Sequence, residues 1–244
     1  MLAVLIAVCL AQVVGAAEVR VAVAANFAST LHVLAEGFRS ETGHRLQIST
    51  GSTGKHYAQI HNGAAFDVFL AGDSARPARL EAEGVGVAGS RFTYAVGRLA
   101  LWVPGESGLG PPDEYLGTAD FRRLAIANPR LAPYGLAAQQ ALQAWQLWDR
   151  MQPRLVRGEN IAQAFQFVAT GNASAGLVAL SLLRAGQMPD GAFRLIPDSL
   201  HKPIRQDALL LRRGEAAEAF LLYLRGDEAT GVIRSAGYRV EADR

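Results

Sequence analysis

The sequence predicts an α/β fold in which mainly parallel sheets are covered by helices on both faces. Short apolar runs rich in β-branched residues alternate with segments whose apolar residues recur at helical spacing, a pattern typical of repeated βαβ units. The chain has 244 residues, of which 50% are hydrophobic and 19% are charged, which is the composition of a packed globular protein. Its length fits one large domain or two of roughly 100 residues each.

The predicted elements follow one another along the chain from residue 19. The first is a strand over residues 19–24, and the helix after it places Phe27, Leu31, Leu34 and Phe38 on one apolar face. The other predicted strands cover residues 46–50, 68–71, 92–103, 124–127, 177–179 and 208–211. The other predicted helices cover residues 54–62, 76–83, 135–147, 161–170, 215–224 and 227–236. Residues 104–112, rich in Gly and Pro, are predicted to form a loop.

Residues 1–17, MLAVLIAVCLAQVVGAA, predict a secretory signal peptide. The segment has no charged side chain, is too short to span a membrane, and ends in small residues that suit signal peptidase. It lacks the basic residues that usually open such a signal, and a buried first strand is the alternative interpretation. The single cysteine, Cys9, lies inside the segment and follows Val8, which disfavours a lipid anchor. We therefore expect an exported protein without a disulfide.

The charge balance disfavours a nucleic-acid site, and the spacing of the histidines disfavours a metal site. The chain carries 24 Lys and Arg against 22 Asp and Glu, a net charge of +2, and it has no basic run. This balance gives no electrostatic case for a nucleic acid, and we expect no nucleic-acid partner. The five histidines have no metal-ligand spacing, and we expect them to be solvated at the surface.

Two predicted strand-to-helix junctions carry polar residues suited to a small anion. The first surrounds Asn26, and the second, STGSTGK at residues 49–55, places Ser52 and Thr53 at a helix start. A helix N-terminus presents unpaired N–H groups and partial positive charge, and α/β sheets bind ligands beyond the carboxyl ends of their strands. Simple helix capping is the alternative for each junction taken alone. The two junctions together favour a binding site.

The second junction also allows two enzyme interpretations. A phosphate-binding P-loop would need Gly in place of Ser49 and Ser or Thr in place of His56, so the motif fails twice. Ser52 and Lys55 match the S-x-x-K motif of serine acyl-transfer enzymes, but the S-D-N and K-T-G motifs are missing from the sequence. A hydrolase with Ser52 as nucleophile and Lys55 as base is therefore the less favoured alternative. We expect that the protein is not an enzyme.

Five sequence blocks form a pattern that covers nearly the whole chain after the signal. They are VAVAANF at 21–27, GSTGKHYAQI at 51–60, GAAFDVF at 63–69, NP followed by APYG within 128–135, and GENI at 158–161. In their order and spacing they resemble the periplasmic molybdate-binding proteins of ABC importers. The resemblance implies the type II periplasmic binding protein fold, with two lobes, each a mostly parallel sheet covered by helices, and a ligand cleft between them.

The same resemblance implies how the chain divides between the two lobes. In this fold the chain crosses from one lobe to the other twice, which we expect near residues 96–99 and 204–208. Domain 1 would comprise residues 18–97 and 206–244, and domain 2 would comprise residues 98–205. The two C-terminal helices would return to pack on domain 1.

The resemblance also implies a set of oxyanion ligands. They are Asn26 through its side-chain amide and a neighbouring N–H, the hydroxyl of Thr53 with Ser52 before it, the hydroxyl of Tyr134, and the backbone N–H of Ile161. Family members grip the anion with such neutral donors, without a Lys or Arg countercharge.

One position departs from part of the family. Another branch has a tyrosine where this chain has Ala179, and we expect Tyr134 to replace that hydroxyl. Lys55 is not a family ligand, and we expect it to be a surface charge near the cleft rim.

The function implied by the resemblance is that of an extracytoplasmic substrate-binding protein. It would capture molybdate and tungstate in the periplasm and deliver the anion to an ABC transporter permease, as a monomer and without a cofactor. A binding protein for another small oxyanion, such as sulfate or thiosulfate, is the alternative within the same fold.

Overall fold

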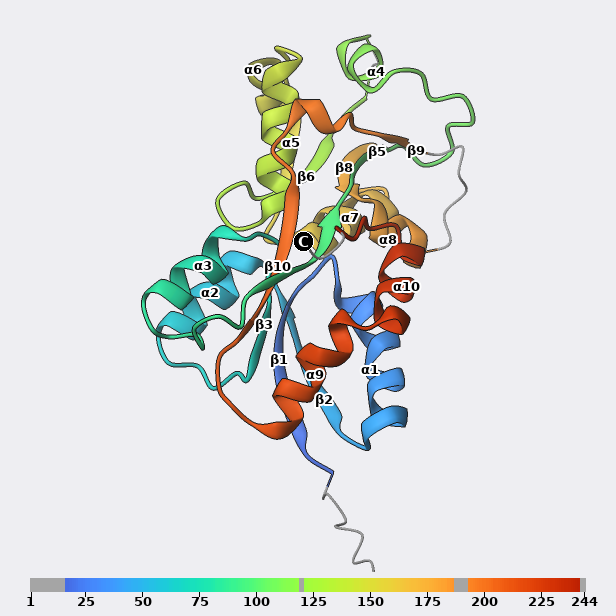
Figure 1. The fold of residues 1–244 in the computed structure, drawn as a ribbon. Coiled ribbons are helices and arrows are strands. Elements are labelled where there is room, and N and C mark those ends of the chain that lie inside the picture. The colour runs from blue at the N-terminus through green and yellow to red at the C-terminus, as the bar shows by residue number, and fades with distance from the viewer. Residues whose placement is uncertain (1–15, 119–120, 187–192, 242–244) are drawn as a thin grey trace, which may run out of the picture.

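The protein consists of two lobes, each built around a sheet that has five strands within the described residues (Figure 1). The computed structural model describes residues 16–118, 121–186 and 193–241. Residues 1–15 of the predicted signal lie outside this range. The predicted two-lobed α/β fold is confirmed. No helix in the described part of the chain has the length and apolar character needed to cross a membrane.

Lobe 1 contains the first and the last helices and strands of the described chain. Its strands are β1 (Glu18–Ala24), β2 (Arg45–Gly51), β3 (Val68–Leu70), β4 (Phe92–Gly97) and β10 (Ile204–Leu210), in the order β2-β1-β3-β10-β4. Its helices are α1 (Ala28–Thr42), α2 (Thr53–His61), α3 (Ala75–Ala82), α9 (Glu215–Arg225) and α10 (Asp227–Ser235). Strands β1, β2 and β3 run parallel, whereas β10 runs antiparallel to both of its neighbours.

The alternation of side chains along β1 explains why lobe 1 has helices on both faces. Val19, Val21 and Val23 pack with α1, α9 and α10 on one face of the sheet. Ala22 points the other way, into the smaller core that includes Ile60 of α2 and residues of α3. Because successive side chains of a strand point to opposite faces, an apolar run buried throughout indicates a central strand.

Lobe 2 is built on the middle of the chain. Its strands are β5 (Leu99–Trp102), β6 (Leu124–Ala127), β7 (Leu155–Gly158), β8 (Ala175–Ala179) and β9 (Phe193–Leu195), in the order β7-β6-β8-β5-β9. Its helices are α4 (Pro112–Thr118), α5 (Pro133–Ala144), α6 (Trp148–Met151), α7 (Ile161–Ala169) and α8 (Leu180–Ala185), with short 3-10 turns at Gln152–Arg154 and Asp198–Leu200.

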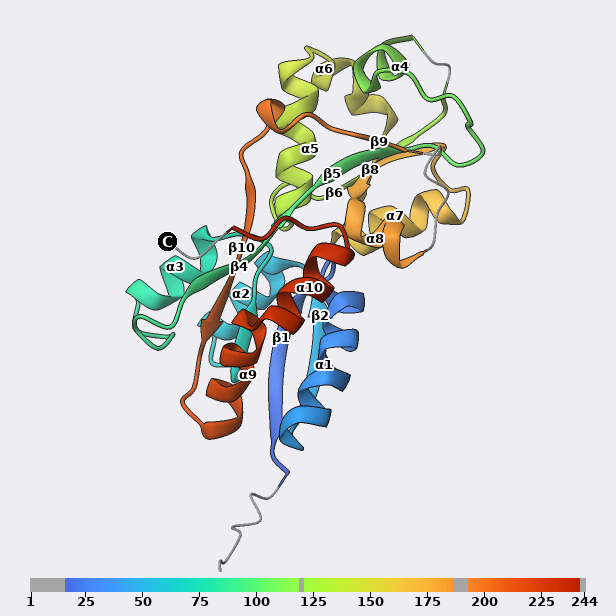
Figure 2. The same cartoon turned by 45° about the vertical axis from the view of Figure 1, so that its right-hand side comes forward.

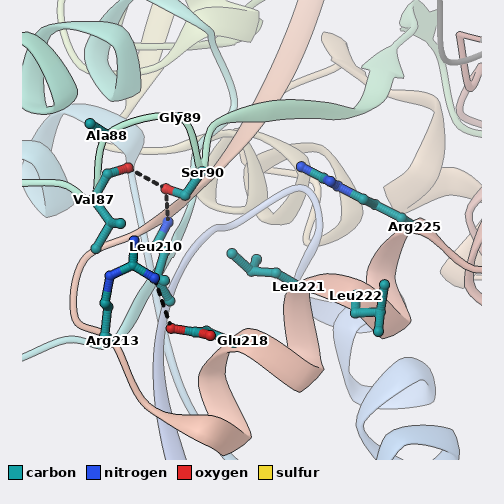
Figure 3. Close-up of a pocket in the computed structure, with 10 residues that line it drawn as sticks. All are labelled: Val87, Ala88, Gly89, Ser90, Leu210, Arg213, Glu218, Leu221, Leu222 and Arg225. Atoms are coloured by element: carbon teal, nitrogen blue, oxygen red, sulfur yellow. Dashed lines mark hydrogen bonds and ion pairs between the residues drawn. The ribbon is translucent and has the colours of Figure 1, made fainter.

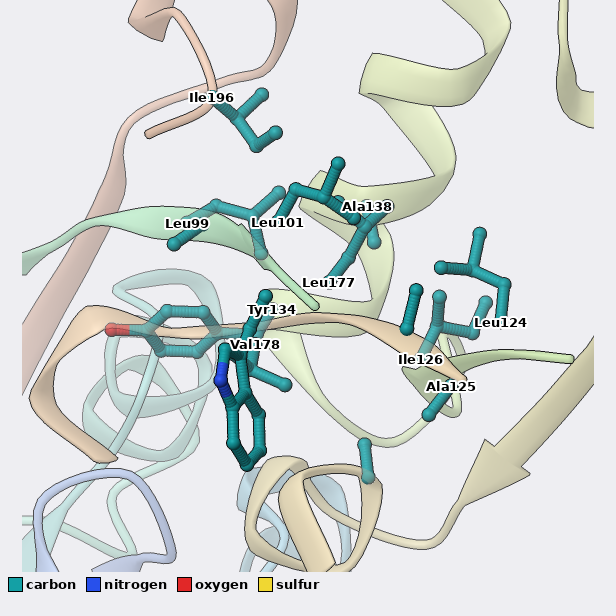
Figure 4. Packing of buried hydrophobic residues seen from close by; sticks show 14 of the residues in the cluster. Leu99, Leu101, Leu124, Ala125, Ile126, Tyr134, Ala138, Leu177, Val178 and Ile196 are labelled. Atoms are coloured by element: carbon teal, nitrogen blue, oxygen red, sulfur yellow. The ribbon is translucent and has the colours of Figure 1, made fainter. Parts of the chain in front are cut away.

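The core of lobe 2 gathers apolar side chains from its central strands around Tyr134 (Figure 4). Trp102 is 2% exposed and stacks on Phe165 of α7, with 4.8 Å between the ring centroids. Trp145 and Trp148 pack against the same core, half-buried. The tryptophans therefore stabilise lobe 2.

Residues 92–103 do not form the single long strand that their apolar pattern predicts. The segment is two strands that belong to different sheets, because β4 ends at Gly97 in lobe 1 and β5 begins at Leu99 in lobe 2. Both halves are buried, so the apolar pattern runs through the crossing without a visible break. Position 97 requires glycine, because a Cβ atom there would collide with the hydroxyl of Tyr134.

A third segment of the chain lies at the boundary between the lobes (Figure 2). After α10, Arg239 pairs with Val96 through two backbone hydrogen bonds of 2.7 and 3.0 Å. Val96 pairs in turn with Arg205 of β10. The Arg239 guanidinium forms an ion pair with Asp198, in the connection that returns from lobe 2. The C-terminal segment therefore contacts both lobes.

The predicted core of lobe 1 can be tested on helix α9, which offers a matched pair of leucines. Leu224 is 1% exposed and belongs to the core, whereas Leu222 is 73% exposed. Leu224→Ala is expected to lower the free energy of unfolding by about 2–5 kcal/mol, because it removes buried methyl groups and leaves a cavity. Leu222→Ala should change it by less than about 0.5 kcal/mol. Urea denaturation measures both, and equal losses would contradict this assignment of the core.

Candidate oxyanion-binding site

Paired loops at the carboxyl ends of parallel strands form the framework of the site. In lobe 1 the register aligns Ala24 with Gly51, and the N–H of Ala25 donates to the Gly51 carbonyl at 2.9 Å. Lobe 2 repeats this arrangement, with the N–H of Asn128 donating to the Gly158 carbonyl at 2.7 Å. Each lobe thus holds two loops side by side, and each loop leads into a helix.

The two pairs of loops face each other across the boundary between the lobes. The N–H of Gly54 donates to the Leu131 carbonyl at 2.9 Å, and a Cβ atom at position 54 would lie only 3.0 Å from that oxygen. The ammonium of Lys55 lies 3.4 Å from a carboxylate oxygen of Glu159. These contacts bring the loop after β2 against the loops after β6 and β7.

The predicted ligand residues are all buried at this meeting point. Their side chains come from both lobes, and each residue is between 1% and 3% exposed; the residues are Asn26, Ser52, Thr53, Tyr134 and Ile161. Four of them are polar, and buried polar groups need partners. Their hydrogen bonds therefore show which of them can still serve a ligand.

Three hydroxyl groups each accept a hydrogen bond from a protein N–H. Thr53 Oγ1 accepts from the backbone N–H of Gly72 at 2.9 Å, and Ser52 Oγ accepts from the backbone N–H of Lys55 at 3.3 Å. Tyr134 Oη accepts from Nε2 of Gln206 at 3.3 Å. A hydroxyl has one proton, and none of these bonds uses it. All three hydroxyls can therefore donate to a further acceptor.

The hydroxyl of Tyr134 stays protonated in this environment. Burial raises the pKa of Tyr134 well above its usual value of 10.0, although its polar contacts with Gln206, the Arg98 backbone and the Ser181 side chain act in the opposite direction. At neutral pH the side chain is a neutral phenol, which can donate its proton to an anion.

Asn26 offers its backbone rather than its side chain. Its Nδ2 atom donates to Gln206 Oε1 at 2.8 Å and to Tyr238 Oη at 3.0 Å, so both amide hydrogens are used within the protein. Its carbonyl accepts from Ser181 Oγ at 3.0 Å and from Tyr238 Oη at 2.7 Å. The expected donation from the side-chain amide does not fit this geometry, and the backbone N–H is the donor that can face a ligand.

The helix starts supply further donors. Ile161 is the first residue of α7, and Asn160 caps that helix by accepting from the N–H of Gln163 at 3.0 Å. The first N–H groups of a helix have no partner within it, so the N–H of Ile161 points toward the boundary as a donor. Ser52 caps α2 in the same way, whereas Asn26 does not cap α1, whose N-cap is Phe27.

A basic pocket opens between the lobes beside these loops. It has a volume of about 680 Å³ and includes Gly54, Gly72 and Pro133, which adjoin the predicted ligands. Its charged lining consists of Arg76, Arg79, Arg130, Lys202, Arg205 and Asp73. Three of the five cationic groups are paired with carboxylates, Arg76 with Asp73, Arg79 with Glu83 and Arg205 with Glu241, so the positive excess of the pocket is small.

Ser52 and Lys55 do not form a nucleophile and base. The hydrogen bond of Ser52 is to the backbone N–H of Lys55, and the Lys55 side chain is 55% exposed and paired with Glu159. A nucleophilic serine needs its base within hydrogen-bond reach of the hydroxyl. The geometry therefore favours a capping and binding role for Ser52.

The expectation of surface histidines was wrong for three of the five. His44, His56 and His201 are 5%, 3% and 8% exposed. The His56 ring packs under the second loop, where a Cβ atom on Gly51 would lie 2.9 Å from Nε2, and burial lowers the pKa of His56. Within the described residues no group of three His, Cys, Asp or Glu side chains is arranged to hold a metal ion.

Another pocket, of about 290 Å³, lies on lobe 1 beside the end of β10 and helix α9 (Figure 3). Its polar groups satisfy one another: Ser90 Oγ donates to the Val87 carbonyl and accepts from the N–H of Leu210, and Arg213 pairs with Glu218. None of the predicted ligands lines it. It is therefore less suited to an anion than the lobe boundary.

Sequence reasoning missed three residues that organise the site. Gln206, Tyr238 and Ser181 bond to Asn26 from positions 155 to 212 residues away along the chain. One signal was present, because Gln206 and Asp207 stand between Arg205 and the apolar end of the strand, and both are 0% exposed. Buried polar residues in a central strand usually serve a hydrogen-bond network.

Comparison with known proteins agrees with this arrangement. A family model described as bacterial extracellular solute-binding protein matches residues 19–239. The chain is 48% identical over 237 residues to the molybdate-binding protein ModA of Azotobacter vinelandii, an alignment that covers 96% of this chain and 93% of that protein. It is 42% identical over 235 residues to ModA of Rhodobacter capsulatus, covering 95% of this chain and 92% of that protein.

Solved structures show the same fold. The Azotobacter vinelandii periplasmic molybdate-binding protein superposes with a TM-score of 0.86 at 38% identity, covering 92% of this chain and 100% of that chain. The sulfate-binding protein SubI from Mycobacterium tuberculosis shares the fold alone, with a TM-score of 0.73 at 12% identity over 91% of this chain and 86% of that chain. The chain therefore belongs to the bacterial extracellular solute-binding proteins, and among them to the family of the ModA proteins.

Proposed function

We propose that this protein binds molybdate and tungstate outside the cytoplasm and delivers them to the permease of an ABC transporter. The observation that carries the proposal is the set of three buried hydroxyls, Ser52, Thr53 and Tyr134, whose protons remain available after each oxygen has accepted an N–H. The two ModA relatives are named for molybdate binding. The site offers neutral donors that converge from both lobes, which suits a small oxyanion.

Neutral donors are sufficient to hold a dianion. Helices α1, α2, α5 and α7 begin at the four loops, so their partial positive charges and free N–H groups point toward the boundary. Each hydrogen bond to a charged acceptor contributes about 1.5–3 kcal/mol. Several fixed donors together therefore offset the cost of removing the anion from water and ordering the lobes around it.

The alternative ligands are other small oxyanions. The fold does not decide between them, because the sulfate-binding neighbour has a similar architecture at 12% identity. The high identity to the ModA proteins favours molybdate, and a smaller tetrahedral anion would leave some donors unpaired, which is costly in a buried site.

The proposed function also has consequences for the location and the assembly of the protein. We infer that residues 1–17 are a secretory signal, that the mature chain acts in the periplasm as a monomer without a cofactor, and that it is not an enzyme. Domain 1, residues 18–97 and 206–244, and domain 2, residues 98–205, would close on the anion around the two crossings. The interlobe contacts of Gly54 and Lys55 support a closed arrangement of this kind.

A calorimetric ligand panel tests the selectivity. Molybdate and tungstate are expected to bind tightly, and sulfate and phosphate at least about 100-fold more weakly, because a smaller anion leaves donors unsatisfied, at about 1–3 kcal/mol for each. Sulfate binding as tightly as molybdate would refute the proposed ligand.

The role of the tyrosine hydroxyl can be tested in isolation. Tyr134→Phe removes one donor and is expected to weaken molybdate binding by about 10- to 150-fold, the equivalent of one charge-assisted hydrogen bond. Tyr115→Phe serves as the control, since Tyr115 is another tyrosine of lobe 2, stacked on Phe121 and outside the site. Isothermal titration measures both variants, and equal affinities would remove Tyr134 from the ligand set.

Lys55 distinguishes binding from catalysis. Lys55→Ala is expected to change molybdate affinity by less than about fivefold, because an exposed ion pair contributes little. Under the acyl-transfer alternative the same substitution would abolish hydrolysis of an activated ester. An ester-hydrolysis rate in the parent protein that disappears in the variant would support the enzyme interpretation instead.

A further inference from the structure

Gln206 is a buried polar residue on the strand that returns to lobe 1. It is 0% exposed and lies on β10, where the pairing with β4 shifts register between Gln206 and Asp207. Its side chain contacts residues of both lobes: Asn26 and Tyr94 from lobe 1, and Tyr134 from lobe 2. It is thus placed to connect the two halves of the candidate site.

The hydrogen bonds around Asn26 have a defined direction. Tyr238 has one hydroxyl proton, and it donates that proton to the Asn26 carbonyl at 2.7 Å. The Tyr238 oxygen can therefore only accept from the Asn26 side chain, at 3.0 Å, and this assigns Nδ2 of Asn26 to that side. The second hydrogen of Nδ2 is then donated to Gln206 Oε1 at 2.8 Å.

The orientation of Gln206 follows from that of Asn26. Its Oε1 atom accepts from Asn26 at 2.8 Å, so the carboxamide oxygen faces lobe 1. The hydroxyl of Tyr94 lies 3.2 Å from the same oxygen and 3.1 Å from the Ala71 carbonyl, and its one proton is shared between these two acceptors. Its Nε2 atom must then face the opposite way, where it donates to Tyr134 Oη at 3.3 Å. Because an amide nitrogen cannot accept, Tyr134 cannot give its proton to Gln206.

We propose that Gln206 is a positioning residue for the anion site: with Tyr238 and Asn26 it forms a directional hydrogen-bond relay that makes Tyr134 a donor toward the ligand. The proposal rests on the proposed function, in which Tyr134 binds the oxyanion. Gln206 does not touch the anion itself. Because it donates to the tyrosine oxygen, it leaves the tyrosine proton free for a further acceptor, so that Tyr134 presents its O–H to the ligand.

The relay also affects which protonation state of a ligand the site prefers. A fully ionised oxyanion presents acceptors alone and satisfies Tyr134, Thr53 and Ser52 together. A ligand that carries its own O–H presents a weaker acceptor at that oxygen, so one of the three donors is less well satisfied. The relay therefore contributes to the preference for an unprotonated oxyanion.

The substitution Gln206→Glu reverses the last step of the relay. The introduced carboxylate accepts the Tyr134 proton, which turns the tyrosine lone pairs toward the ligand. Molybdate affinity near pH 8 is expected to fall by about tenfold or more. Gln47→Glu is the matched control, since Gln47 lies exposed on β2, and it should leave the affinity unchanged.

The pH profile separates this role from a structural one. Burial raises the pKa of a carboxyl group, so lowering the pH toward about 6 protonates the introduced group, which can then donate to Tyr134 and restore part of the affinity. The surrounding titratable groups do not interfere: burial raises the pKa values of Tyr94, Tyr134 and Tyr238, so they stay protonated, and Asp207 is paired with Arg91 at 2.6 Å. The parent protein and Gln47→Glu should show no such recovery.

A double-mutant cycle tests whether Gln206 acts through the tyrosine. In a Tyr134→Phe background, Gln206→Glu is expected to cause less than about a threefold further loss, because the proton that it redirects is gone. Additive losses, or a loss that does not change with pH, would overturn the proposal. Failure of the parent protein to bind molybdate would instead refute the proposed function.

A second variant covers the case in which Gln206→Glu does not fold. Tyr238→Phe removes the hydroxyl that starts the relay and keeps the ring that packs edge-on against Phe27, 5.4 Å between centroids. Because Asn26 is then free to turn its amide, molybdate affinity should fall by about three- to tenfold, and the loss should vanish in a Tyr134→Phe background. Unchanged affinity in Tyr238→Phe would count against the relay.

Discussion

The single proton of a hydroxyl group is the constraint on which the candidate site depends. Thr53, Ser52 and Tyr134 each receive an N–H from the protein, so each must direct its own proton to something else. Burial makes this constraint strict, because no solvent is present to satisfy a misdirected group. Such groups can bind an anion because their O–H and N–H dipoles point toward it. The net charge of the chain, +2, therefore does not indicate the kind of ligand.

The two lobes divide this set of donors between them. Asn26, Ser52 and Thr53 follow strands of lobe 1, whereas Tyr134 and Ile161 follow strands of lobe 2. The same local device, an N–H after one strand bonded to the last carbonyl of its neighbour, holds the paired loops in each lobe. The donors are divided between the lobes, so in the proposed function ligand binding and closure of the lobes would be thermodynamically coupled. Contacts such as that between Gly54 and Leu131 form where the two halves meet.

The fold could be predicted from the sequence because buried strands and amphipathic helices leave regular patterns. The predicted strand at 124–127 is β6 as observed. The break at Arg98 leaves no mark in the apolar pattern, because the strands on both sides of it are equally buried; the expectation of a crossing near residues 96–99 comes from the family resemblance. In the site, loop motifs identified Ser52 and Thr53, but the direction of the Asn26 amide depends on Tyr238, 212 residues away, which no local pattern encodes. Gln206 belongs to a polar triplet, Arg205 to Asp207, before the apolar end of its strand, and the sequence does not show that it is buried.

The C-terminal segment after α10 adds a mechanical property to the fold. Three segments of the chain lie side by side at the boundary, because Val96 pairs with both Arg205 and Arg239. Arg239 also forms an ion pair with Asp198. Two parallel connections would allow one lobe to twist as well as bend against the other. A third length of chain bonded alongside them would resist torsion more than bending, so the proposed closure would be restricted mainly to a bending motion. Such a restriction would bring the donors of the two lobes into the same alignment at each closure.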